Sequence, residues 1–90
     1  MTRDEAAKPG PPPRTLLEAH GALARIRPGR EAPLEVWRAY YQRSAALYAE
    51  IAEIDRGHHH EALSMAEQAQ NSAREIEAQI PGGEGREGDR

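Results

Sequence analysis

The chain of 90 residues contains no cysteine and no phenylalanine, and its aromatic residues are one tryptophan and three tyrosines. The absence of cysteine excludes disulfide bonds, and the scarcity of large aromatic side chains limits the apolar surface that a core can bury. A chain of this size rarely gains more than about 3–5 kcal/mol from its own core. We therefore expect additional stability to come from self-association or from a partner protein.

Long apolar runs are also missing, and positive charge is not in excess. No stretch is apolar enough to cross a bilayer or to act as a signal peptide, so we expect a cytoplasmic protein without a membrane partner. The formal net charge of −3 argues against general affinity for nucleic acid. Residues 14–43 nevertheless hold six Arg and three Glu, whereas residues 44–90 hold four Arg and ten acidic residues. This uneven distribution is typical of ordinary solvent-exposed helix faces. The alternative interpretation is a polar molecule that pairs head to tail with itself or offers its acidic half to a basic partner.

The two ends of the chain carry little that could be buried. Residues 1–14 contain four prolines, which cannot continue a helix and favour an extended path. Residues 81–90 consist of glycine, proline and charged residues. We expect both tails to be disordered and residues 15–80 to form one domain.

Helical periodicity begins directly after the proline-rich segment. Thr15 and Glu18 have the three-residue spacing of a capping box, which predicts that the first helix starts at Thr15. The pair Pro28-Gly29 predicts its end near residues 26–27. A helix of only about three turns is marginal in isolation, so we expect it to pack on the rest of the fold.

Two longer helices follow, joined by a very short connection. We expect the second to begin within residues 32–34 and to end near residues 55–56, with Gly57 as a left-handed C-terminal cap. The third is expected to start within residues 58–61 and to end near Ile80. Short connections place neighbouring helices antiparallel. The sequence therefore predicts an all-α, three-helix fold in which a short N-terminal helix packs on an antiparallel helical hairpin.

Two apolar stripes predict how the hairpin packs. On the second helix, mostly large side chains recur at steps of three and four: Trp37, Tyr40, Ser44, Leu47, Ile51 and Ile54. On the third helix, mostly alanines recur at the same steps: Ala62, Ala66, Ala69, Ala73, Ile76 and Ile80. Such steps keep side chains on one helical face. We expect large side chains to pack against alanines, which lets the two helix axes approach closely.

All four aromatic residues lie in the second helix, and they are the candidate partner-binding residues: Trp37, Tyr40, Tyr41 and Tyr48. They form an apolar face wider than one neighbouring helix needs, and leftover aromatic surface is typical of a contact surface. No set of residues has the pattern of a catalytic site, and no cofactor motif is present. We therefore predict a small non-enzymatic interaction or regulatory accessory protein, acting as a homodimer or on a larger regulatory protein.

An alternative function is association with nucleic acid through the basic first half of the chain. Its candidate residues are five arginines: Arg25, Arg27, Arg30, Arg38 and Arg43. Aromatic side chains beside arginines can stack on bases while the arginines contact phosphates. The competing interpretation is that these aromatic side chains form the core, because the second helix has little else that is large to bury.

A run of three histidines, His58 to His60, invites a second alternative, a metal-responsive protein. Imidazole is a good ligand for zinc, nickel and copper. Neighbouring residues on a helix do not face each other, however, and a chelating pair needs a spacing of three or four. We interpret His58, His59 and His60 as a polar turn and helix start, and His20 in the first helix as a boundary residue with a satisfied ring nitrogen.

Residues 48–69 resemble one tetratricopeptide-type hairpin. The resemblance depends on Gly57 in the turn, Ala62-Leu63 five residues on, and small residues at Ala66 and Ala69. The first helix of this segment departs from the family pattern at its Trp, Gly and Tyr positions. A true array needs about three or more repeats, so the resemblance implies hairpin geometry and not peptide binding.

A longer stretch, residues 15–80, is similar to a family of short helical proteins from high-GC actinobacteria. The similarity depends on the segments TLLEAHGALARIRP and VWRAYYQRSAALYAEIAEIDRGHHHEAL. This resemblance implies a bacterial cytoplasmic protein and adds no site residue, because no activity is established for the family.

Overall fold

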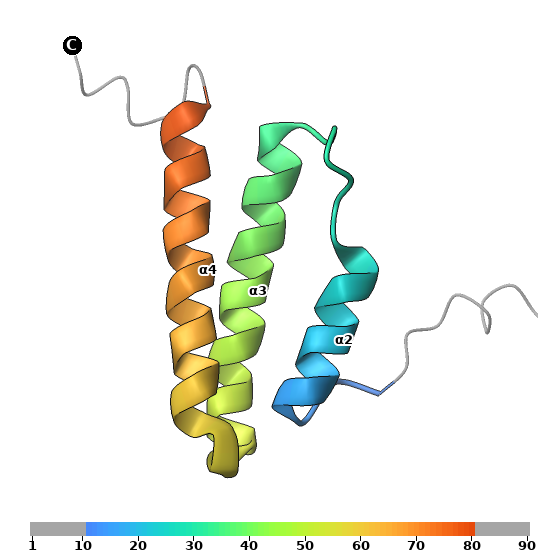
Figure 1. Cartoon of the computed structure of the whole chain (residues 1–90), viewed down its shortest axis with the longest axis vertical. Helices are drawn as coiled ribbons and strands as arrows, with labels where there is room; N and C mark the ends of the chain where they lie inside the picture. The colour runs from blue at the N-terminus through green and yellow to red at the C-terminus, as the bar shows by residue number, and fades with distance from the viewer. Residues whose placement is uncertain (1–10, 81–90) are drawn as a thin grey trace, which may run out of the picture.

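The part of the chain described by the computed structural model, residues 11–80, consists of helices and the connections between them (Figure 1). Its elements in chain order are α2 (Leu16–Ile26), α3 (Leu34–Ile54), the short 3-10 helix η1 (Arg56–His58) and α4 (His59–Gln79). The predicted all-α fold with three α-helices is therefore confirmed for these residues. None of these helices combines the length and the apolar character that crossing a bilayer requires.

Most of the two predicted tails lies outside the part of the chain that the structure describes. Residues 1–10 and 81–90 lie outside the described residues. Residues 11–14 lead into α2, and Pro11, Pro12 and Pro13 border a groove beside α2 and α3.

The start of α2 follows the predicted capping pattern with one difference. The Thr15 hydroxyl accepts a hydrogen bond from the Glu18 N–H at 3.1 Å, as expected. The Glu18 carboxylate accepts from the N–H of Arg14 at 2.8 Å, one residue before the usual partner in a capping box. The helix ends at Ile26, directly before the Pro28-Gly29 pair, as the sequence predicts.

The connection between α3 and α4 differs from the expected glycine cap. α3 ends at Ile54, and the Asp55 N–H donates to the Ile51 carbonyl at 2.7 Å. Gly57 lies inside η1 and does not form a left-handed cap. The 3-10 turn reverses the chain and forms a backbone hydrogen bond of its own, in which the His58 N–H donates to the Asp55 carbonyl at 2.9 Å. No positive φ is then required at Gly57.

The alanine stripe of α4 is confirmed, because Ala62, Ala66, Ala69 and Ala73 are all buried. The stripe predicted for α3 is correct only in part. Ser44 and Ile51 are buried, Trp37, Tyr40 and Leu47 are half-buried, and Ile54 is 37% exposed.

The remaining buried residues of α3 are Ala45, Tyr48 and Ala52, which the predicted stripe omits. The seam between α3 and α4 therefore includes alanines from both helices. A single stripe on α3 fails because this helix packs on two neighbours at once, and each neighbour needs its own set of side chains.

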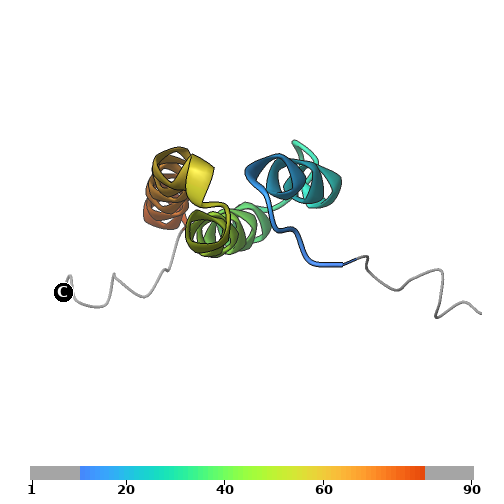
Figure 2. The same ribbon diagram turned by 90° about the horizontal axis from the view of Figure 1, so that it is seen from below.

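α3 is the central helix of the fold. It packs extensively on the antiparallel α4, and it contacts α2 over a shorter length (Figure 1). Figure 2 shows that α2 and α4 lie on the same side of α3. The buried core that these contacts form is small: Ala19, Leu23, Tyr48, Ile51, Ala52, Ala62 and Ala66.

Candidate functional site: the groove between α2 and α4

A groove of about 290 Å³ opens between α2 and α4, above α3. Its floor comes from α3, and its lining residues there are Tyr40, Tyr41, Ser44 and Tyr48. Leu23 and Arg27 form the wall on the α2 side. Met65, Gln68, Ala69 and Ser72 form the wall on the α4 side. The two walls face each other because both outer helices lie on one side of α3 (Figure 2).

Three aromatic side chains at the start of α3 form a cluster at one end of this groove. The ring centroids of Trp37, Tyr40 and Tyr41 lie 5.4–5.8 Å apart, with two of the three pairs in edge-to-face geometry. The Arg27 guanidinium lies 5.0 Å from the Trp37 ring centroid, a cation–π distance. The indole N–H of Trp37 donates to the Gly29 carbonyl at 3.2 Å. The rings are therefore held in place before any partner binds.

Hydrogen bonds connect the groove floor to α2. The Tyr40 hydroxyl donates to the Leu23 carbonyl at 3.3 Å. A hydrogen bond of 2.7 Å joins the Tyr48 hydroxyl to Nδ1 of His20, and the two rings meet edge to face at 5.5 Å. The expectation that His20 has a satisfied ring nitrogen is confirmed. Burial is the main cause that raises the pKa of Tyr48, and the nearby Tyr40 raises it further.

Other polar groups of the groove have no partner among residues 11–80. The Tyr41 hydroxyl, the Gln68 amide and the Ser72 hydroxyl make no hydrogen bond with the described residues. Arg27 makes its cation–π contact but no ion pair within this part of the chain. The groove thus offers aromatic rings together with polar groups that a ligand could bind.

The four predicted partner-binding residues are brought together, with different roles. Tyr40, Tyr41 and Tyr48 line the groove, and Trp37 packs behind Tyr40 and Tyr41 without lining it. Tyr48 is only 6% exposed, so it acts mainly as a buried support for the floor.

The sequence prediction missed the α4 wall of this groove. Met65, Gln68 and Ser72 follow one another at steps of three and four, next to the alanine stripe. That spacing was a usable signal, but only the position of α2 decides that this edge of α4 borders a groove.

The five arginines of the nucleic-acid alternative are not gathered on one surface. Arg27 stacks on Trp37, and Arg38 lies 3.9 Å from the Glu77 carboxylate. Arg25 and Arg43 border a different groove of about 690 Å³, beside Pro11–Pro13. Arg30 is exposed in the connection between α2 and α3.

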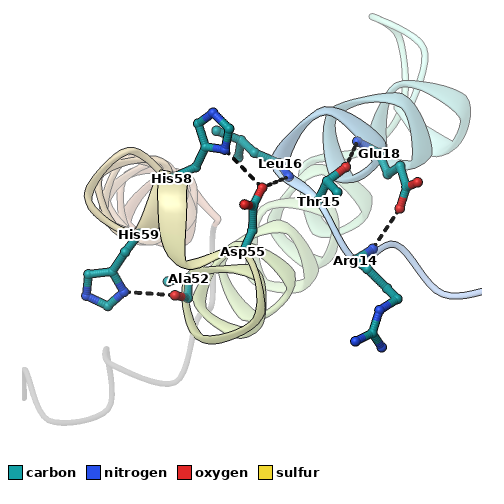
Figure 3. A network of polar contacts seen from close by, with 8 residues as sticks. All are labelled: Arg14, Thr15, Leu16, Glu18, Ala52, Asp55, His58 and His59. Carbon is teal, nitrogen blue, oxygen red and sulfur yellow. Dashed lines mark hydrogen bonds and ion pairs between the residues drawn. The ribbon is translucent and has the colours of Figure 1, made fainter.

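Asp55 forms a second polar site at the closed end of the hairpin (Figure 3). Its carboxylate accepts from the N–H of Leu16, the first residue of α2, at 2.9 Å. The same oxygen lies 3.0 Å from Nδ1 of His58. The hydrogen bond from Leu16 is the main cause that lowers the pKa of Asp55, and His58 lowers it further by hydrogen bond and charge, against the opposing effect of burial.

The three histidines at this end do not converge. The His59 ring donates from Nδ1 to the Ala52 carbonyl at 2.8 Å, whereas the His58 ring turns toward Asp55, and Figure 3 shows the two rings on opposite sides. His60 meets His59 edge to face, with ring centroids 5.3 Å apart. Within residues 11–80, no three His, Cys, Asp or Glu side chains gather closely enough to hold a metal ion.

The described residues define an all-α protein with an open groove between its two outer helices. No protein-family model matches the chain, and no curated protein or solved structure is significantly similar to it. Both resemblances found in the sequence therefore remain predictions, and the groove is the main basis for a functional interpretation.

Proposed function

We propose that this protein is a small non-enzymatic interaction module that takes an α-helix of a partner into the groove between α2 and α4. The observation that supports this proposal best is the groove itself, with two helical walls and a floor of Tyr40, Tyr41 and Tyr48. Packed helical bundles commonly contain four helices, and a fourth helix in this groove would complete such an arrangement.

The chemistry of the groove suits an amphipathic helix. Its aromatic floor can bury apolar side chains, and tyrosine is among the residues that dominate binding energy at protein interfaces. The Tyr41 hydroxyl, Gln68 amide and Ser72 hydroxyl, which have no partner among residues 11–80, can bind polar side chains at the edges of that apolar stripe. Arg27 adds one positive charge to the α2 wall.

The two alternatives from the sequence receive less support. A nucleic-acid surface needs several arginines on one face, but Arg38 is paired with Glu77 and Arg25 lies on a different groove from Arg27. A metal site needs converging ligands, but the rings of His58 and His59 diverge.

A pair of photo-crosslinking variants tests the proposal. Gln68 and Gln70 are both exposed glutamines of α4, but Gln68 lines the groove and Gln70 borders the back of the α3–α4 seam. Benzoyl-phenylalanine at position 68 should give crosslinks to a helical segment of a specific protein, a second copy included. The same probe at position 70 should give few or none.

Binding measurements then test whether the crosslinked segment occupies the groove. The segment is made as a peptide and titrated against purified protein. Gln68→Trp fills the groove and should weaken binding about tenfold or more, whereas Gln70→Trp should leave it nearly unchanged. Equal crosslinking from both positions, or equal binding by both Trp variants, would contradict the proposal.

A further inference from the structure

We infer that the partner helix is α2 of a second copy of this chain. In this dimer, each α2 stays on its own α3 and also fills the groove of the other copy, so the two chains are related by a two-fold axis. The inference depends on the proposed function, because it names the occupant of the same groove. Three features of α2 support it: an exposed leucine on a side that does not pack on α3, a length similar to that of the groove, and basic flanking residues opposite in charge to α4.

The unpartnered side of α2 is marked by Leu17. This side chain is 80% exposed, more than any other large apolar side chain of the described residues. Leu17, His20, Ala24 and Arg27 follow at steps of three, four and three, which places them on one side of the helix. His20 bonds to Tyr48 and Arg27 lines the groove, so this side borders the opening. α2 therefore presents Leu17 and Ala24, two exposed apolar residues, on a side other than the one that packs on α3.

The length of α2 matches the groove. A helix of 11 residues is about 16 Å long, and the floor from Tyr40 to Tyr48 extends about 12 Å along α3. Small residues also permit two α2 helices to lie close together at the two-fold axis. Ala24 is exposed, and a Cβ added to Gly21 would meet no atom within 4 Å.

The charges of residues 14–30 and of α4 are complementary. α2 itself holds one Arg and one Glu, but three flanking arginines (Arg14, Arg27 and Arg30) make residues 14–30 basic, whereas α4 holds four Glu and one Arg. Glu61 and Glu75 share one side of α4 with the groove residues Met65, Gln68 and Ser72, since positions 61, 65, 68, 72 and 75 follow at steps of four and three. A second α2 in the groove would lie beside this acidic edge, so the attraction favours a second copy over an acidic helix of another protein.

A matched pair of substitutions tests the dimer by sedimentation equilibrium over about 1–100 µM protein. Leu17→Glu places a charge in the inferred interface, and Val36→Glu makes the same change at an exposed apolar residue in the first turn of α3. A carboxylate in the first turn of a helix is compatible with helix formation, so both variants should fold. Leu17→Glu should raise the dimer dissociation constant about tenfold or more, and Val36→Glu less than about threefold.

Cysteine crosslinking locates the interface independently, because the chain contains no cysteine of its own. Ala24→Cys and Ala39→Cys introduce one thiol each at exposed alanines of α2 and α3. A short bismaleimide should link two Ala24→Cys chains efficiently, and two Ala39→Cys chains no more than random collision allows.

The outcomes separate this inference from the proposed function. A wild-type monomer throughout the concentration range, or equal crosslinking by the two cysteine variants, would overturn the second copy as occupant. In that case, a groove-specific crosslink from position 68 to another protein would still support a helix-binding module. A dimer that Leu17→Glu leaves intact would also overturn the inference.

Discussion

At the scale of single residues, Asp55 joins parts of the chain that are far apart in the sequence. Its carboxylate accepts from the N–H of Leu16, and it is only 17% exposed at the end of the hairpin. The first N–H groups of a helix have no partner within that helix, and negative charge is favoured there by the helix dipole. Asp55 thus caps α2 from 39 positions further along the chain and holds this short helix in position.

Replacing Asp55 tests this cap and its dependence on pH. The pKa of Asp55 is lower in the folded protein than in the unfolded chain, so its contribution is complete at neutral pH and is lost as the pH falls through the lowered folded pKa. Asp55→Ala should therefore lower the Tm at pH 7. The difference in Tm from wild type should shrink as the pH falls below about 4.

A nearby carboxylate provides the control for this prediction. Glu53 lies two residues before Asp55. Both Glu53 and its ion-pair partner Arg56 are exposed. Exposed ion pairs contribute little to stability, so Glu53→Ala should change the Tm much less than Asp55→Ala. Equal effects, or a Tm difference for Asp55→Ala that persists at acidic pH, would show that Asp55 does not act as a charged cap.

The hydroxyls of two tyrosines provide a second comparison. Tyr48→Phe removes the hydrogen bond to His20, whereas Tyr41→Phe removes a hydroxyl without a partner among residues 11–80. Urea unfolding should show a loss of about 0.5–1.5 kcal/mol for Tyr48→Phe. Tyr41→Phe should remain within about 0.5 kcal/mol of wild type. An unchanged stability for Tyr48→Phe, or a loss no larger than that of Tyr41→Phe, would mean that the hydrogen bond to His20 does not stabilise the fold.

At the scale of the elements, the helices differ in how they are stabilised. α4 buries four alanines in a long contact with α3. α2 is about half as long, buries only Ala19 and Leu23, and depends on polar contacts from Thr15, Asp55 and Tyr40. We therefore expect local opening to begin at α2, because few buried apolar contacts oppose it.

Enlarging one alanine of α4 tests the packing of the hairpin. Ala69 is 6% exposed, so Ala69→Leu should force the seam with α3 apart and cost about 1–3 kcal/mol. Ala78→Leu makes the same change at an exposed position of the same helix and should be nearly neutral. The free energy of unfolding in urea compares the two. An unchanged stability for Ala69→Leu would mean that this alanine does not face α3.

At the scale of the whole molecule, charge is separated between its two sides. The α2 side is basic and α4 is acidic, while the contact between Arg38 and Glu77 already pairs one charge from each long helix. Opposite charges on different parts of one surface favour association between copies over attraction of a uniformly charged polymer.

This charge separation makes a prediction about nucleic acid. Arg25 and Arg43 border one groove and Arg27 another, so a phosphate backbone cannot follow them along a single stripe. Fluorescence anisotropy with short duplex DNA and single-stranded RNA should show no binding tighter than about 100 µM at physiological salt. Micromolar binding with a steep dependence on salt would revive the alternative based on the five arginines.

The helices and their packing seam were largely predictable from the sequence. Thr15, the Pro28-Gly29 pair and the alanine stripe of α4 act through neighbours three or four residues away, and such local effects can be read directly from spacing. The three tyrosines of the groove were predicted as part of a contact surface because the aromatic face is wider than one neighbouring helix needs, and their role in contacts stays a prediction.

The groove and the contacts of α2 were decided only by the tertiary structure, because they depend on where α2 lies relative to α4. Both lie on one side of α3, with the groove between them, and α2 contacts Tyr48 through His20. The tertiary structure also brings the Asp55 carboxylate to the start of α2, a contact across 39 positions that no local pattern encodes. Periodicity in the sequence identifies which side of a helix is apolar, but only the assembled fold determines which neighbour covers it.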